Sequence, residues 1–309
     1  MGLVSYLYKK QFVCRYDKEV GFPYYSYSDF KGLNQEGYTF INSKGIEIHY
    51  FYFYYDNFKD DKIVLFLHGL APGHAAYFAE IDALARRGFK VLTLDYSGCG
   101  DSKGKILGSI NQPTRDVNEL LDLLKNEKPI IVVGHSLGGY TSLNIINLRK
   151  EIKKAAILSG FLSAESIIGP IIKNKFFSSR ILKYEKKVYP EYYDLKNIDY
   201  LKTTDDDLFF IQSEDDSMIP YSVSLKVVEE IDNKHIRTLK VQNRKHNPNY
   251  SDAAINYMNE VFGGYYSLLR QKKLKTDAEK INYFKDVSLS KLVEQDEEMF
   301  DQIASFINE

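Results

Sequence analysis

The chain has 309 residues, of which 44% are hydrophobic and 27% are charged, and its formal net charge is −1. This composition excludes a disordered, collagen-like or coiled-coil chain. Because domains that neutralise nucleic-acid phosphates carry a clear basic excess, nucleic acid is not expected as a partner. The length fits two domains or one large α/β domain with insertions.

The cysteines, the first residues and the most apolar stretch restrict further the class of protein that the chain can belong to. Cys14 and Cys99 are too few for a disulfide framework and lack the C-x-x-C spacing of zinc or redox sites. The first residues carry their charge after a very short apolar run, the reverse of a secretory signal. The most apolar stretch, 155–172, is interrupted by glycine, proline and glutamate, so no transmembrane segment is expected. We expect a cytoplasmic protein with no metal or other cofactor, and the oligomeric state is left open.

The predicted elements alternate along the chain. Residues 1–36 are aromatic and irregular and are interpreted as an N-terminal covering segment. Beyond them, short and often continuous apolar runs alternate with helical patterns, which predicts a mostly parallel sheet with helices on both faces. The first two strands are expected to form an antiparallel hairpin at one edge. The expected strands are 37–42, 46–54, 63–67, 91–94, 130–133, 155–158, 208–211 and 237–242, and the expected helices lie near 75–87, 114–126, 137–149, 221–232 and 250–272.

Two regions interrupt this alternation. Residues 161–204 are too long for a simple crossover and are interpreted as a helical cap inserted above a core made of 37–160 and 205–309. The last region, 273–309, ends in apolar residues at helical spacing, which predicts a helix that docks on the sheet.

A candidate nucleophile lies between an expected strand and an expected helix. The sequence Gly134-His-Ser-Leu-Gly138 has the G-x-S-x-G form, which is weak alone and gains weight from this context. A serine on a sharp strand-to-helix turn needs small residues two positions away on either side, because larger side chains would clash. The helix N-terminus would also favour a developing negative charge. Ser136 is therefore the candidate nucleophile, and the alternative is a serine that merely caps the helix.

A serine hydroxyl needs a base that takes its proton. His246 follows the last expected strand, in a loop that contains Pro248. Residues just beyond the carboxyl ends of parallel strands gather in one crevice, so His246 is expected beside Ser136. The other histidines are interpreted as structural rather than as the base: His49, His68, His74, His135 and His235.

The base in turn needs an acid that orients it. Three acids, Glu214, Asp215 and Asp216, follow the strand expected at 208–211, and Asp216 is the chosen candidate. The order Ser, Asp, His along the chain is the order found in α/β-hydrolases.

An oxyanion hole completes such a site. The strand expected at 63–67 ends in a loop of glycines and a proline that could present a backbone amide. We expect the N–H groups of Leu70 and Leu137 to point at the substrate carbonyl oxygen, although a plain loop is the alternative. The neighbouring residues expected to border the substrate are His68, Gly69 and His135.

Several motifs together carry a family resemblance: His68-Gly69, Asp95-Tyr-Ser-Gly-Cys-Gly-Asp-Ser102, Gly134-His-Ser-Leu-Gly-Gly139, Met218-Ile-Pro220 and His246-Asn247. They resemble the α/β-hydrolase superfamily, in its serine-aminopeptidase and monoacylglycerol-lipase-like branch. The resemblance covers about 37–262, and 161–204 correspond to the variable cap of that family. Its members carry the acid four residues before the proline, which supports Asp216. They usually have Arg where this chain has Tyr96, so packing there is expected to differ.

The resemblance implies an α/β-hydrolase fold and a serine hydrolase that acts on a small-molecule acyl substrate. Cleavage of carboxylic esters with small or medium acyl chains, through an acyl-enzyme, is the first hypothesis. The apolar part of the cap, 167–172, then either lines the acyl pocket or packs the cap itself. Peptidase, amidase and thioesterase activity use the same machinery and stay open. A binding module that kept the fold without catalysis is the alternative of another class. No role is inferred for 263–285.

Overall fold

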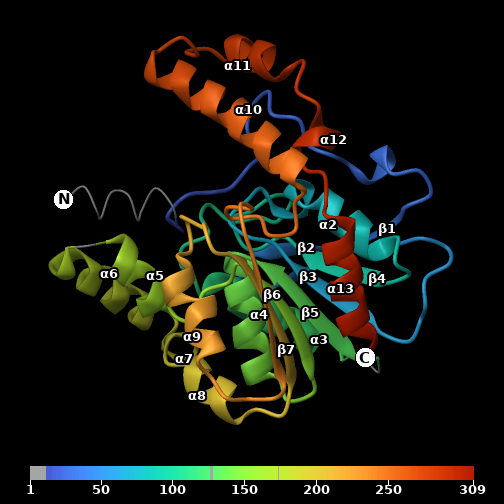
Figure 1. Ribbon diagram of the computed structural model, residues 1–309, viewed down its shortest axis with the longest axis vertical. Coiled ribbons are helices and arrows are strands. Elements are labelled where there is room, and N and C mark those ends of the chain that lie inside the picture. Colours follow the sequence, from blue (N-terminus) through green and yellow to red (C-terminus); the bar gives the residue numbers. More distant parts are fainter. Residues whose placement is uncertain (1–11, 126–127, 173) are drawn as a thin grey trace.

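A single sheet forms the centre of the molecule, which is a computed structural model that describes residues 12–125, 128–172 and 174–309. The N-terminal residues used to argue against a secretory signal lie outside this described part. The strands are β1 (Asn34–Ile41), β2 (Glu47–Tyr54), β3 (Ile63–Leu67), β4 (Lys90–Leu94), β5 (Ile130–His135), β6 (Lys154–Leu158), β7 (Asp207–Ser213) and β8 (Ile236–Val241). Their order is β1-β2-β4-β3-β5-β6-β7-β8 (Figure 1).

The sheet is mostly parallel, as predicted. β2 runs antiparallel to both β1 and β4, whereas the pairs from β4 through β8 are parallel. The first strand starts at Asn34, three residues before the expected start, because pairing with Tyr54 extends the hairpin. Each predicted strand is present.

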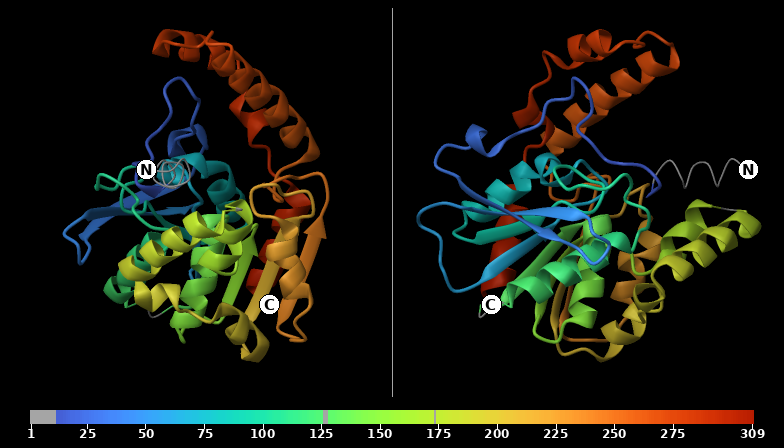
Figure 2. Two further views of the ribbon diagram at one scale, coloured as in Figure 1. Left: turned by 90° about the vertical axis from the view of Figure 1, so that its left-hand side faces the viewer. Right: turned by 180° about the vertical axis from the view of Figure 1, so that it is seen from behind.

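Helices cover both faces of the sheet (Figures 1 and 2). The helices are α2 (Phe78–Ala85), α3 (Gln112–Leu124), α4 (Leu137–Leu148), α5 (Ala164–Ile171), α6 (Lys175–Val188), α7 (Pro190–Tyr193), α8 (Asn197–Thr203), α9 (Leu225–Glu229), α10 (Asp252–Arg270), α11 (Asp277–Phe284), α12 (Leu289–Leu292) and α13 (Glu297–Asn308). Short 3-10 turns occur at Tyr27–Asp29, Gly73–Ala76 and Tyr221–Val223.

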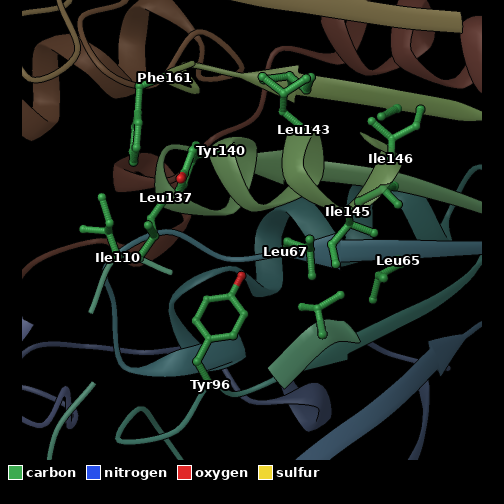
Figure 3. Packing of buried hydrophobic residues seen from close by; sticks show 14 of the residues in the cluster. Leu65, Leu67, Tyr96, Ile110, Leu137, Tyr140, Leu143, Ile145, Ile146 and Phe161 are labelled. Atoms are coloured by element: carbon green, nitrogen blue, oxygen red, sulfur yellow. The ribbon is translucent and has the colours of Figure 1, made fainter. Parts of the chain in front are cut away.

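Alternate side chains of the central strands enter two separate cores, as the period of a strand requires. Leu65 and Leu67 of β3 pack with α3, α4 and the insertion between β6 and β7. Figure 3 shows both leucines beneath the side chains of α4. Val64 and Phe66 of the same strand point the other way, toward α2 and α13. This two-sided burial explains why these strands are continuous apolar runs in the sequence.

The predicted helix over 221–232 is wrong in its extent. A 3-10 turn occupies Tyr221–Val223, and α9 begins only after Ser224, whose φ of −131° and ψ of −103° are not helical. The Ser224 hydroxyl donates to the Gly160 carbonyl, and the Leu225 N–H donates to the Gln212 side chain at 3.1 Å. These tertiary hydrogen bonds hold the backbone out of one continuous helix.

The apolar pattern that predicted a C-terminal docking helix is divided between two helices. The break follows α12, where Gln295 bridges to Tyr250 and the N–H of Asp296 donates to the carbonyl of Asn249. The Asp296 side chain then caps α13 by accepting the Met299 N–H at 3.1 Å. α13 alone docks on the sheet, and α12 packs against α10.

The insertion between β6 and β7 consists of α5 to α8. Ile167 and Ile168 are buried in the same core as α4, so they pack this segment onto the body of the protein. On α6, the buried carboxyl of Glu185 accepts a hydrogen bond from the Ser109 hydroxyl. Burial raises the pKa of Glu185 to about 8. The side chains of 170 and 171, part of the stretch considered for an acyl pocket, lie outside what the structure describes.

Helices α10 to α12 form a layer of their own beside the N-terminal segment (Figures 1 and 2). Val261, Tyr265, Phe284 and Leu292 form a small core there, and Phe22 packs against it. None of the described helices is both long and apolar enough to span a membrane.

The burial of α13 leads to a stability prediction. Phe300 is 1% exposed. Phe300→Ala should lower the free energy of unfolding by about 3–5 kcal/mol, because it removes a ring from a packed core. Urea denaturation followed by circular dichroism measures the change. The control Leu123→Ala removes a side chain that is 51% exposed on α3, and a loss no larger than the control's would contradict the core position of Phe300.

Candidate active site

The three residues proposed for catalysis come from loops that follow three parallel strands. Ser136 comes directly after β5, Asp216 follows β7, and His246 follows β8. The carboxyl ends of these strands share one edge of the sheet. The Oγ of Ser136 lies 2.8 Å from Nε2 of His246, and Nδ1 of His246 lies 2.8 Å from Oδ2 of Asp216. The structure therefore brings the three side chains into one hydrogen-bonded chain.

Ser136 has a backbone conformation that is unusual for a residue with a side chain. Its φ is 58° and its ψ is −118°, and its N–H donates to the Leu158 carbonyl at 2.8 Å. A Cβ on Gly134 would lie 2.3 Å from the carbonyl oxygen of Gly138, and a Cβ on Gly138 would lie 1.9 Å from that of Leu67. Both glycines are therefore required by close packing around the turn.

The acidic turn after β7 gives two neighbouring carboxylates different partners. Oδ1 of Asp216 accepts the N–H groups of Met218 and Ile219 at 2.8 and 3.0 Å, which leaves Oδ2 to face His246. Asp215 instead forms an ion pair with Lys245 at 2.8 Å. Partial burial opposes ionisation of Asp215, but hydrogen bonds from Lys245 and Ser213 lower its pKa to about 2. Contact with the imidazole thus favours Asp216 as the orienting acid.

The two amides proposed for the oxyanion hole lie beside Ser136. Leu137 is the first residue of α4, and Leu70 follows Gly69, where a Cβ would come within 3.1 Å of the Ser136 Cβ. Within the described part of the chain, neither the Leu70 nor the Leu137 N–H has a protein acceptor. Free amides at a helix N-terminus and in an adjoining loop suit the stabilisation of a developing oxyanion.

His68 lies in the interior rather than at the surface of the site. Its ring stacks on Tyr96 with centroids 3.9 Å apart, and its Nδ1–H donates to the Gly69 carbonyl at 2.7 Å. Burial lowers the pKa of His68 to about 4. A neutral, fully buried ring supports the loop that carries Gly69 and Leu70. Tyr96 occupies the position at which members of the resembling family usually carry arginine. Its hydroxyl donates to the His68 carbonyl at 3.0 Å.

His135 and Tyr77 connect the loops of the site. The Gly69 N–H donates to the Tyr77 hydroxyl at 3.0 Å, and that hydroxyl lies 2.9 Å from Nδ1 of His135. Nε2 of His135 lies 2.8 Å from the His246 carbonyl oxygen. Burial, with the nearby His246, lowers the pKa of His135 to about 3, so its neutral ring accepts at Nδ1 and donates at Nε2. We call this chain of hydrogen bonds the Tyr77–His135 bridge.

Tyr77 did not emerge from the sequence. It is one of 25 tyrosines and belongs to no motif. Its role follows from contacts with Gly69 and His135, which are 8 and 58 residues away along the chain. Contacts between residues so far apart along the chain produce no local sequence pattern that would identify Tyr77.

His74, Asp95 and Asp101 could be considered as metal ligands. Their ligand atoms lie within 4.8 Å of one another. Oδ1 of Asp95 accepts the backbone N–H of His74 at 2.6 Å and faces its Nδ1 at 2.9 Å. Oδ2 accepts the Asp101 N–H at 2.8 Å. These hydrogen bonds show that the buried carboxylate of Asp95 joins the loops that carry His74 and Asp101, and that the side chain of Asp101 is exposed.

A cavity of about 420 Å³ lies next to the site, at Leu70 and Asn247. Most of its lining residues come from three parts of the chain: some of residues 16–25 in the N-terminal segment, some of residues 70–79, and residues of α10 and α12. None of the expected substrate-bordering residues, His68, Gly69 and His135, lines this cavity.

Comparison with known proteins identifies the family. The model of the family described as serine aminopeptidase, S33, matches residues 59–248, more than half of the chain. The chain belongs to this family. The match begins just before β3 and ends just after His246, so this family segment contains Ser136, Asp216 and His246.

The relatives in this comparison match over shorter segments. The putative methylesterase 11, chloroplastic, of Arabidopsis thaliana is 31% identical over 107 residues, which are 34% of this chain and 27% of that protein. A 2-hydroxy-6-oxononadienedioate/2-hydroxy-6-oxononatrienedioate hydrolase of Escherichia coli is 28% identical over 119 residues, 37% of this chain and 41% of that protein. The chain thus spans less than half the length of these curated relatives.

A solved structure shows the same fold over most of the chain. An esterase of Pyrococcus furiosus matches with a TM-score of 0.57 at 18% sequence identity, covering 84% of this chain and 97% of that one. Together with the sheet order, this confirms the α/β-hydrolase fold that the motifs predicted.

The Tyr77–His135 bridge leads to a prediction about reactivity. Tyr77→Phe keeps the ring but leaves the Gly69 N–H and His135 Nδ1 without their shared partner. Loss of these two hydrogen bonds should lower the rate at which a fluorophosphonate modifies Ser136 by about ten-fold. The rate is measured by time-resolved labelling at a temperature where circular dichroism shows both proteins folded.

The matched control is Tyr266→Phe, which removes the hydroxyl of a tyrosine that is 55% exposed on α10. It should leave the labelling rate within about two-fold of the parent protein, as expected for a surface hydroxyl. Equal rates for the parent protein and Tyr77→Phe would show that the bridge does not position the reacting groups.

Proposed function

We propose that the chain is a serine hydrolase that cleaves carboxylic esters of small or medium acyl chains. The observation that carries this proposal is the hydrogen-bonded chain Ser136–His246–Asp216, with both heavy-atom distances at 2.8 Å. The left-handed backbone of Ser136 supports it, because strain of this kind is concentrated at functional turns.

The geometry suits acyl transfer to water. Ser136 Oγ attacks the ester carbonyl carbon while His246 Nε2 takes the hydroxyl proton. Asp216 accepts the Nδ1–H bond and stabilises the imidazolium, and the Leu70 and Leu137 amides bind the oxyanion. The alkoxide leaves with the proton from Nε2, which produces an acyl-enzyme on Ser136. Water, deprotonated by the same nitrogen, then releases the acid and restores the serine.

The choice of an ester as substrate has support beyond the geometry. A relative with 31% identity over its matched segment is named a putative methylesterase. The family description names an aminopeptidase, and a peptide amide would use the same three side chains. Rates on p-nitrophenyl esters of increasing chain length, compared with those on aminoacyl anilides, separate the two. Esters should be the better substrates, and a preference for the anilides would move the assignment to peptidase.

Removing the nucleophile tests the proposal most directly. Ser136→Ala should abolish both labelling by a fluorophosphonate and hydrolysis of p-nitrophenyl acetate, because no acyl-enzyme can form. Mass spectrometry of the labelled parent protein should place the probe on a peptide that contains Ser136. Labelling that persists in the variant would mean that another residue is the nucleophile.

The neighbouring acids provide an internal comparison. Asp216→Asn should lower kcat by about 10⁴-fold, because the amide no longer holds the imidazole in the reactive tautomer. Asp215→Asn, the matched control one residue away, alters an ion pair with Lys245 and should leave kcat within about ten-fold of the parent protein. If the large loss occurred in Asp215→Asn alone, the acid would be Asp215.

A further inference from the structure

The cavity beside the proposed site adjoins two parts of the catalytic machinery. Leu70, whose amide is proposed for the oxyanion hole, lines the cavity together with Asn247, which follows His246. Ser136 and His246 do not themselves line the cavity, so a substrate group in this space would reach it past Leu70 and Asn247 from a carbonyl bound over Ser136. The volume of about 420 Å³ is within the range of small-molecule sites.

The outer wall of the cavity is aromatic and comes from parts of the chain outside the family segment 59–248. Phe22 of the N-terminal segment stacks on Phe262 of α10, with centroids 5.8 Å apart and an interplanar angle of 18°. Phe22 also meets Phe284 of α11 edge-on at 5.3 Å. The two views in Figure 2 show the N-terminal segment beside these helices. The ring contacts fix the two segments to each other and give the cavity a defined outer side.

The charges of the wall restrict what it can bind. Asp17 and Glu19 line the cavity, and none of its described lining residues is a lysine, arginine or histidine. Asp17 pairs with Arg15 at 2.6 Å, and Glu19 accepts the Tyr265 hydroxyl at 2.8 Å. A carboxylate or phosphate on the substrate would face these two acids. The nearby cations are already engaged, Arg15 by Asp17 and Lys18 over the Tyr24 ring at 5.8 Å from its centroid, so burial of an anion here is costly.

In the cap, Ile167 and Ile168 are only 8% and 6% exposed and belong to the main core, whereas Phe176 of α6 is exposed at the surface. The described apolar space next to Leu70 is formed instead by the N-terminal segment and by α10 and α12.

We propose that this cavity is a subsite for the neutral apolar part of the ester, and that residues 16–25 with α10 and α12 determine substrate choice. The inference rests on the proposed function, because the group must belong to an ester held at Ser136. The subsite accepts an aromatic or branched aliphatic group and rejects an anionic group of similar size. The acyl part and the alcohol part share this chemistry, so the test has an arm for each.

The acyl arm compares p-nitrophenyl 5-methylhexanoate with p-nitrophenyl hydrogen glutarate, in which a carboxylate replaces the terminal isopropyl group of the same chain. The alcohol arm compares the acetates of 2-naphthol and of its 6-sulfonate. In at least one arm, kcat/KM for the neutral ester should exceed that for the anionic ester by about ten-fold or more, because only the neutral group gains from leaving water.

A cation introduced into the wall should change this preference. Leu289→Lys places an ammonium group at the start of α12 and should reduce the neutral-to-anionic ratio about ten-fold in the arm whose group enters the cavity. The matched control Leu123→Lys makes the same substitution on an exposed face of α3 and should leave the ratio unchanged. A ratio that stays constant in both arms for Leu289→Lys, or shifts equally in the control, would overturn the proposal.

Labelling of Ser136 by a small alkyl fluorophosphonate separates this failure from failure of the proposed function. Normal labelling with an unaltered ratio rejects the subsite alone, whereas a parent protein without labelling rejects the hydrolase and the subsite together.

If Leu289→Lys does not fold, Phe262→Ala provides a second test, because it enlarges the cavity. Its control is Tyr266→Ala on the same helix. Phe262→Ala should raise relative activity on bulkier neutral esters, and no change relative to Tyr266→Ala would reject the subsite.

Discussion

The close approach of α4 to the end of β3 is the contact on which the arrangement of the site depends. A single added carbon on Gly138 would meet the Leu67 carbonyl oxygen at 1.9 Å, so helix and strand are in contact through their backbones. This contact lets the chain turn sharply at Ser136 and aims the hydroxyl toward the loop that carries His246. It also brings Gly69, and with it the Leu70 amide, to the same place. The geometry of the reacting groups is therefore a consequence of backbone packing in the middle of the sheet.

Much of this arrangement could be predicted from the sequence because it follows from short-range rules. Continuous apolar runs mark strands buried on both faces, and parallel strands place their following loops at one edge. These rules predict that Ser136, Asp216 and His246 lie close together in space. The family resemblance, in which the acid lies four residues before the proline, supported Asp216 over Asp215, and the observed contact with the imidazole agrees with this choice. The roles assigned to these residues are still proposals.

The parts that could not be predicted depend on contacts between distant residues. The break between α12 and α13 arises because Gln295 bridges to Tyr250, and the apolar spacing continues through the break. The Tyr77–His135 bridge likewise joins loops that share no pattern in the sequence. The aromatic contact of Phe22 with Phe262 spans almost the whole chain, and neither residue is distinctive in its local surroundings. In each case the deciding interaction is formed only after the chain has folded.

The shared aromatic wall of Phe22 and α10 has an evolutionary consequence. Residues 16–25 and the helices α10 and α12 meet at the cavity, while the residues proposed for chemistry lie in the stretch between them. Mutations in these flanking segments can therefore change the cavity without disturbing the strained serine turn. This separation would let related proteins evolve different substrate preferences while they keep the same residues at the reactive centre.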